Sequence, residues 1–286
     1  GFSGQGTTIA VLDTGIDGNH EAFQGGKILA FKDYTSWPPQ VRSPYDDDGH
    51  GTHCASIAAG NPPAGGASGG RYRGVAYNAD LLIARVLGAS TYGYVVEAVN
   101  WVVSNRNTYN VHVMSLSIGT VNQQGSPVHS DSMNSACNDA VGYGIVVCAA
   151  AGNDGEEGLR IGSPGNAPHV VTVGSSNDYG QLSSFSSRGP GISTGAMKPD
   201  VLAPGEYIKA ARASGTSMGG SGWTNGVVDP TNYIGAQGTS MSCPHVAGVA
   251  AILREANGDT SPGDIRNALR ESAPNANNPN NERGCG

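Results

Sequence analysis

The chain contains 286 residues with a formal net charge of −7, and 38% of them are apolar against only 14% charged. This composition favours a soluble globular domain over a disordered chain, whose signature is high charge with few apolar residues. It also argues against a nucleic acid partner, because phosphate binding requires clustered Lys and Arg. No apolar run approaches the roughly 18 residues that a membrane span requires, so we expect no membrane partner.

Short runs rich in β-branched residues alternate along the chain with stretches of helical spacing. The runs are nearly continuously apolar, as expected for strands that are covered on both faces. The first helical stretch has Val95, Val99 and Val102 on one face, and the second follows Ser130, a suitable N-cap. The predicted strands are Thr8–Leu12, Leu81–Val86, Val111–Leu116, Ile145–Cys148 and Val170–Val173, and the predicted helices are Tyr94–Asn105, Asp131–Val141 and Met241–Glu255.

The alternation of strands and helices predicts an α/β fold with a mainly parallel central sheet. Two segments rich in Gly, Ser, Pro and Asn, at Asn61–Gly70 and Gly215–Gly226, are typical of surface loops. The sequence has no repeat and no evident domain boundary. We therefore expect a single domain over residues 1–286, which ends in a loose tail from Pro274 to Gly286.

The five cysteines lack the spacing of a metal site, and their odd number leaves at least one of them unpaired within a monomer. A disulfide between Cys137 and Cys148 stays open, because pairing depends on geometry that a sequence does not supply. The remaining cysteines are Cys54, Cys243 and Cys285.

An acid and a histidine occupy positions suited to catalysis. Asp13 follows an apolar run, at the end of a predicted strand where parallel sheets gather functional groups, although a helix cap or a turn is an alternative role. His50 lies between two glycines, which leave its imidazole approachable. His53 follows three residues later, but zinc proteases pair His at i and i+4 around a Glu, so metal binding is the less favoured interpretation.

A serine and an asparagine complete the set. Ser240 follows a Gly-Thr turn and begins an apolar helix, whose N-terminal amides favour an oxyanion, although a simple N-cap would look the same. Asn153 ends a strand of small residues, as a side-chain oxyanion donor would, and its alternative is an ordinary Gly-Asn turn.

The four segments resemble the subtilisin-like serine protease (subtilase) family in order, residue type and spacing. The quoted motifs are Val11–Gly15, Asp48–His53, Ala149–Asp154 and Gly238–His245, and the resemblance extends from Gly6 to about Arg270. It implies a three-layer sandwich with a mainly parallel central sheet and helices on both faces. It further implies a secreted serine endopeptidase that forms an acyl-enzyme without a catalytic cofactor. The implied catalytic residues are Asp13, His50 and Ser240, with Asn153 as oxyanion donor.

The resemblance also implies how substrate is held. Extended peptides would add as strands against two segments, a mode that tolerates many sequences. Small residues wall the first specificity pocket, which leaves room for a large apolar side chain, and Asp154 at its mouth would tolerate a basic one. The implied substrate-binding residues are Ser90, Thr91, Tyr92, Gly93, Ser115, Leu116, Ser117, Ala150, Ala151, Gly152, Asp154 and Gly162.

Asp46, Asp47 and Asp48 admit several interpretations. A solvated loop is the simplest one, a cation site is another, and a kexin-like preference for dibasic substrates is less favoured. For calcium, Ala22 stands where the usual high-affinity loop of the family has an aspartate. A second family site would use the carbonyls of Pro168 and Val170 and the carboxylate of Asp200. The alternative for Asp200 is a turn residue or a salt bridge.

Family members are made with a signal peptide and with a propeptide that inhibits the enzyme and assists its folding. We therefore expect secretion and such a propeptide partner. We also expect a monomer that acts on protein and peptide substrates. Two other functions stay open. The chain could be a silent scaffold that only binds peptides, which the intact set of catalytic residues disfavours. It could also be an acyl transferase or peptide ligase, because an amine can intercept the same acyl-enzyme. A serine nucleophile favours hydrolysis.

Overall fold

The computed structural model describes residues 1–88, 91–92, 94–119, 130–156, 161–191, 195, 197–216, 218, 224–228 and 232–286. Its helices are η1 (Glu21–Phe23, a 3-10 helix), α1 (His50–Ala59), α2 (Val95–Asn105), α3 (Asp131–Gly142), α4 (Thr239–Asn257) and α5 (Pro262–Glu271). Its strands are β1 (Thr8–Asp13), β2 (Ile28–Asp33), β3 (Gln40–Val41), β4 (Asp80–Arg85), β5 (Leu87–Gly88), β6 (Thr91–Tyr92), β7 (Val111–Leu116), β8 (Val146–Ala150), β9 (Val171–Ser176), β10 (Val201–Pro204), β11 (Ile208–Ala211), β12 (Thr224–Val228) and β13 (Tyr233–Ala236).

The central sheet has the strand order β10-β9-β8-β7-β1-β4-β2-β3. Every neighbouring pair is parallel except β2 and β3. The five predicted strands correspond to β1, β4, β7, β8 and β9, and the three predicted helices correspond to α2, α3 and α4. The prediction of an α/β fold with a mainly parallel sheet is therefore confirmed.

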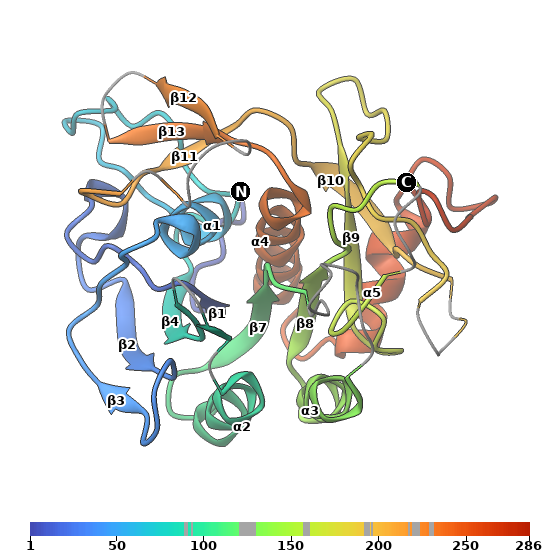
Figure 1. Cartoon of the computed structure of the whole chain (residues 1–286), viewed down its shortest axis with the longest axis horizontal. Helices are drawn as coiled ribbons and strands as arrows, with labels where there is room; N and C mark the ends of the chain where they lie inside the picture. The colour runs from blue at the N-terminus through green and yellow to red at the C-terminus, as the bar shows by residue number, and fades with distance from the viewer. Residues whose placement is uncertain are drawn as a thin grey trace.

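The sheet is the middle of three layers because successive strand residues face opposite sides. In β1, Ile9 and Val11 pack into a buried cluster with residues of α1, α4 and α5. The alternate residues Ala10 and Leu12 pack into a second cluster with residues of α2 and α3. Figure 1 shows α2 and α3 on one side of the sheet and α1 and α4 on the other. Both faces are thus covered by helices, as predicted.

A small antiparallel sheet of β11, β13 and β12 lies over α1 and α4. Its Ala210, Ile234 and Ala236 pack against Cys54 of α1 and Met241 of α4 in a third buried cluster. The predicted loop Gly215–Gly226 overlaps the start of β12, and part of it lies outside the described residues. This sheet holds the two helices that begin at His50 and Thr239 against each other.

The C-terminal segment is not loose, in contrast to the prediction. Its backbone donates from Cys285 N to Asp200 O at 2.9 Å, and Leu202 N donates to Gly286 O at 3.0 Å. The Cys285 side chain is buried. The C-terminus therefore lies beside β10 (Figure 1). The many Asn and Pro residues of the segment form turns that let it pack, which composition alone does not distinguish from disorder.

The sheet has a topological switch at β1. The chain runs from β1 to β2 and β4 on one side of it, and to β7, β8, β9 and β10 on the other. Parallel sheets form a crevice at such a point, outside the carboxyl ends of the strands. Asp13 ends β1, Ser117 follows β7, and the segment with Asn153 follows β8. Among the described residues, no helix is both long and apolar enough to cross a membrane.

Candidate active site

Asp13 and His50 form a close polar pair at the crevice. Asp13 is fully buried at the end of β1, and His50 is the first residue of α1. Their Oδ1 and Nδ1 atoms are 2.6 Å apart, and Asp13 Oδ1 also accepts a hydrogen bond from Thr14 N at 2.7 Å. Gly51 permits this approach, because an added Cβ would clash with Gly15 O and lie 3.1 Å from the Asp13 Cβ.

The pair is electrostatically coupled. Burial alone would lower the pKa of His50, but the adjacent Asp13 carboxylate overcomes that effect and raises this pKa well above its usual value. Asp13 Oδ2 has no hydrogen-bond partner within the described part of the chain. The imidazole is thus oriented through Nδ1, which leaves Nε2 as its second proton-carrying atom.

Asp46 fixes the start of α1 and is not a solvated loop residue. It is buried, and its Oδ1 accepts from Thr14 Oγ1 at 3.0 Å and from Gly49 N at 2.9 Å. Its Oδ2 accepts from Thr52 N at 2.9 Å and from the Thr52 hydroxyl at 2.6 Å. One carboxylate therefore joins the residue after Asp13 to the first turn of α1.

The other two aspartates of this loop differ from Asp46. Asp47 is half exposed, and its Oδ1 lies 2.8 Å from NH1 of the buried Arg85. Asp48 accepts a hydrogen bond from His50 N at 3.1 Å. Solvation describes Asp47 best, so the interpretation of the three aspartates as one solvated loop was wrong for Asp46.

Ser240 is the second residue of α4 and lies where three elements meet. Its Oγ is 3.3 Å from Ser117 O, to which it donates, and its carbonyl accepts from Ser117 Oγ at 2.7 Å. The same carbonyl is 3.3 Å from Cys54 Sγ, which in turn lies 3.8 Å from His50 Nδ1. Ser240 is thus linked to His50 through one side chain of α1, and it lies in the first turn of α4, at the positive end of the helix dipole.

Asn153 is bound to the first turn of α4. Its Oδ1 accepts from Thr239 N at 2.8 Å and from Thr239 Oγ1 at 3.0 Å, and Gly152 N donates to the same hydroxyl at 3.1 Å. These contacts hold the amide with its oxygen toward Thr239, so that Nδ2 is its remaining donor end. Thr239 was not among the predicted site residues, although its place directly before Ser240 was a signal.

The predicted pocket residues come from β7, β8 and the segments that follow them. Ser115 is buried with its Oγ 3.6 Å from Cys243 Sγ. The Leu116 side chain packs into the cluster below the sheet, so only its backbone is available to a substrate. Ala150 ends β8, and Ala151 N donates to Val173 O at 2.9 Å.

The remaining predicted substrate residues are distributed as follows. Asp154 is exposed and accepts from Ser187 Oγ at 3.2 Å, while Gly162 is buried and accepts from Asn166 N at 2.9 Å. Thr91 and Tyr92 form β6, which pairs antiparallel with β5. Ser90 and Gly93 lie outside the described residues.

His53 does not share a metal with His50. It is fully buried, and its Nε2 lies 3.1 Å from Ile234 O. Burial lowers the pKa of His53 to about 3. Within the described part of the chain, the only cluster of three metal-ligating side chains is Asp13, His50 and Cys54, which belongs to the site above. All five cysteines are free and buried, so the open Cys137–Cys148 disulfide does not form.

The predicted calcium ligands Pro168, Val170 and Asp200 do converge, but cationic side chains occupy their oxygens. Lys198 Nζ lies 2.6 Å from Val170 O and 2.8 Å from Asp200 Oδ2. Arg266 NH1 lies 2.7 Å from Pro168 O, and its NH2 lies 2.8 Å from Asp200 Oδ1. This set of residues does not fit a calcium ion, and the salt-bridge alternative describes Asp200.

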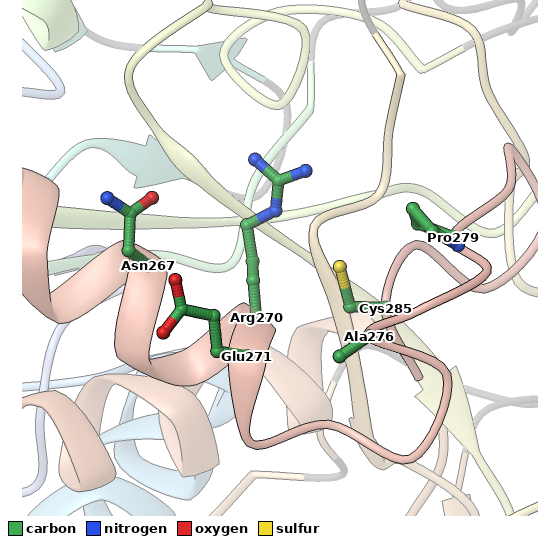
Figure 2. A pocket seen from close by; sticks show the side chains of 6 residues that line it. All are labelled: Asn267, Arg270, Glu271, Ala276, Pro279 and Cys285. Carbon is green, nitrogen blue, oxygen red and sulfur yellow. The ribbon is translucent and has the colours of Figure 1, made fainter.

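A pocket apart from these residues lies between α5 and the C-terminal segment. Figure 2 shows Asn267, Arg270 and Glu271 projecting from the helix, with Ala276, Pro279 and Cys285 on the segment beside it. It shares no residue with the candidate active site.

Comparison with known proteins identifies the family of the chain. The model described as the Subtilase family matches residues 4–286. The chain belongs to the subtilase family. It is 36% identical over 282 residues to Serine protease AprX of Bacillus subtilis (strain 168), covering 94% of this chain and 61% of that protein. It is 32% identical over 280 residues to Subtilisin E of the same strain, covering 96% and 62%. The chain thus spans about three-fifths of the length of these curated relatives.

Similar solved structures confirm the fold. The "S41 Psychrophilic Protease" superimposes with a TM-score of 0.79 at 28% identity, covering 99% of this chain and 91% of that chain. A cold adapted subtilisin-like serine proteinase gives a TM-score of 0.71 at 31% identity, covering 95% and 84%. The three-layer arrangement predicted from the resemblance is therefore that of a subtilisin-like protein.

Proposed function

We propose that this subtilase is a serine endopeptidase that uses Asp13, His50 and Ser240, with Asn153 as oxyanion donor. The observation that carries the proposal is the 2.6 Å contact of Asp13 Oδ1 with His50 Nδ1, beside a helix whose first turn contains Ser240. Family membership supports peptide hydrolysis as the reaction.

In the proposed reaction, Ser240 Oγ attacks the carbonyl carbon of the scissile bond while His50 Nε2 takes the hydroxyl proton. Asp13 holds the imidazole through Nδ1 and stabilises its cation. Ser240 N and Asn153 Nδ2 stabilise the oxyanion. His50 then passes the proton to the leaving amine, and water hydrolyses the acyl-enzyme with the same histidine as base. This chemistry uses no cofactor.

The raised pKa of His50 has a direct consequence for this reaction. The base must be neutral to accept the proton of Ser240, so activity is lost as the pH falls through the pKa that Asp13 raises. We therefore expect the activity to be greatest on the alkaline side of neutrality.

For the substrate, we propose broad specificity with a preference for large apolar side chains before the scissile bond. The support is the set of small residues at Ser115, Ser117, Ala150, Ala151 and Gly152, together with a backbone that can pair with an extended peptide. We further propose that residues 1–286 form one catalytic domain that is secreted, monomeric and made with an inhibitory propeptide.

The test is labelling with a fluorophosphonate followed by peptide mapping. We expect the label on Ser240 and its loss in Ser240→Ala, with peptide hydrolysis reduced about a million-fold. Ser242→Ala is the matched control, because Ser242 lies two residues further along α4 and its buried hydroxyl has no partner among the described residues. Labelling that persists in Ser240→Ala, or no labelling of the folded chain, would contradict the proposal and favour a silent scaffold. Product analysis with an added amine distinguishes hydrolysis from acyl transfer.

A further inference from the structure

The Asp200 carboxylate lies at the junction of three parts of the fold. Asp200 precedes β10, is almost completely buried, and accepts a hydrogen bond from Thr172 N of β9 at 2.8 Å. Its carbonyl accepts from Cys285 N of the C-terminal segment, and its Oδ1 faces Arg266 of α5. The charge balance around this carboxylate therefore affects how β10, α5 and the C-terminus are held together.

Two cations donate hydrogen bonds to this carboxylate, and the Nε of a third, Arg270, lies 3.9 Å from its Oδ1. Lys198 is fully buried, and its ammonium bridges Val170 O at 2.6 Å and Asp200 Oδ2 at 2.8 Å. Arg266 bridges Pro168 O at 2.7 Å and Asp200 Oδ1, which it contacts through Nε at 2.9 Å and NH2 at 2.8 Å. Every oxygen that the family resemblance assigns to calcium is thus a hydrogen-bond acceptor for one of these two side chains.

A calcium ion does not suit this arrangement for two reasons. Calcium requires six to eight oxygen ligands at about 2.3 to 2.6 Å, whereas Lys198 and Arg266 already use the four oxygens of Pro168, Val170 and Asp200. A divalent cation would also be repelled by the positive charges of Lys198 and Arg266 in a poorly solvated region.

We propose that Lys198 and Arg266 take the place of calcium in this chain, so that the junction of β9, β10, α5 and the C-terminal segment is stable without a metal ion. The ammonium spans one carbonyl and one carboxylate oxygen, and the guanidinium spans the others. An ion that the environment must supply is thereby replaced by charges built into the chain, and chelators leave this junction intact.

The test compares thermal unfolding in calcium and in a chelator, using Ser240→Ala to prevent self-digestion. Asp200→Asn is added to this background, with Asp178→Asn, an exposed aspartate, as the matched control. We expect Asp200→Asn to lower the midpoint by roughly 10 °C in both buffers, because it leaves the buried Lys198 and the partly exposed Arg266 without their anion. Any rise in the unfolding midpoint that calcium causes should therefore be the same in the parent and in the Asp200→Asn variant. If calcium raised the midpoint of the parent but not that of Asp200→Asn, the proposal would be overturned.

A second measurement does not depend on the folding of that variant. Crystals of the Ser240→Ala chain are soaked in a lanthanide salt, since lanthanide ions replace calcium at oxygen sites and scatter anomalously. We expect no anomalous peak among Pro168, Val170 and Asp200. A peak there, with the Lys198 side chain displaced, would show that the site takes a metal ion and would overturn the proposal. Neither experiment requires the chain to be a protease.

Discussion

Asp13 and Asp200 are both buried carboxylates at strands of the central sheet, but their partners differ. Asp13 contacts one titratable imidazole at 2.6 Å, and its Oδ2 has no partner within the described part of the chain. Asp200 has Lys198 on one oxygen and Arg266 on the other, with Thr172 N as a further donor. The negative charge of Asp13 is balanced only in part, whereas the negative charge of Asp200 is surrounded by positive charge.

The difference separates two uses of the same side chain. A buried carboxylate whose negative charge no cation balances raises the pKa of the base beside it, which Asp13 does to His50. A carboxylate with a cation on each oxygen has its own pKa lowered, as Lys198 and Arg266 do to Asp200 against the effect of burial. The first arrangement suits proton transfer, whereas the second fixes structure.

The largest expected effect is on turnover in Asp13→Asn. The amide would stabilise neither the correct tautomer nor the cation of His50, so kcat for peptide hydrolysis should fall about ten thousand-fold. Its unfolding midpoint should change much less than that of Asp200→Asn, which in turn should retain its turnover per folded molecule. Measurements of kcat and of the midpoint for both variants check this expectation. If each substitution lowered both quantities alike, Asp13 and Asp200 would not have separate roles.

Asn153→Asp should produce the next largest loss. The new side chain has nearly the same shape as Asn153 but offers no N–H to an oxyanion, so kcat should fall by about 100 to 1,000-fold with KM little changed. Asn177→Asp, in the turn that follows β9, is the control. A variant that raises KM without lowering kcat would assign Asn153 to ground-state binding instead.

His53 allows a comparison within α1, because its pKa is lowered whereas the pKa of His50 is raised. Burial lowers the pKa of His53 from 6.5 to about 3, so between these values the unfolded chain binds a proton that the folded chain does not. The stability that this difference provides is fully present above pH 6.5 and is lost as the pH falls toward 3. Between pH 6.5 and 4.5 the loss should be about 2 kcal/mol, because its slope approaches roughly 1.4 kcal/mol per pH unit.

His53→Gln in the Ser240→Ala background tests this expectation. Glutamine can still donate to Ile234 O but does not titrate in this range. Urea unfolding at several pH values should therefore show a shallower loss of stability below pH 6.5 than in the parent. Equal slopes would mean that other groups cause the acid sensitivity.

The sequence predicted those elements whose apolar pattern is strong. β7 was predicted with the bounds that it has, and α2, α3 and α4 lie within two residues of their predicted ends. α1 was missed because its ten residues are mostly Gly, Ala, Ser, Thr and His, which carry no helical periodicity. α5 was missed as well, although Ser261 before Pro262 was a valid N-cap signal.

The residues of the site also divide into those that the sequence predicted and those that it did not. The motifs indicated Asp13, His50, Asn153 and Ser240, and the structure brings Asp13 to His50 and Asn153 to the start of α4. Long-range partners were not predictable. Arg266 is 66 residues from Asp200, and no local pattern indicates that its guanidinium would reach an oxygen expected to bind calcium. Equally, nothing in a run of three aspartates indicates which one is buried.

The smallest expected effect concerns the stability of the chain, and it compares Asp46 with Asp47, two adjacent aspartates that differ in burial. Asp46 accepts hydrogen bonds from Thr14, Gly49 and Thr52, so Asp46→Asn would place an amide N–H against existing donors and should cost about 2 kcal/mol of unfolding free energy. Asp47→Asn removes only a half-exposed ion pair with Arg85 and should cost under about 1 kcal/mol.

Activity should follow the same order, because Asp46 joins the strand end that carries Asp13 to the helix that carries His50. Urea unfolding and kcat, measured for both variants, check this expectation. Equal costs for the two substitutions would mean that Asp46 acts as a solvated aspartate after all. Unequal costs would instead indicate that Asp46 is a third kind of buried carboxylate. Such a carboxylate neither shifts the pKa of a neighbour nor pairs with a cation, but aligns Asp13 with His50 through backbone and hydroxyl donors.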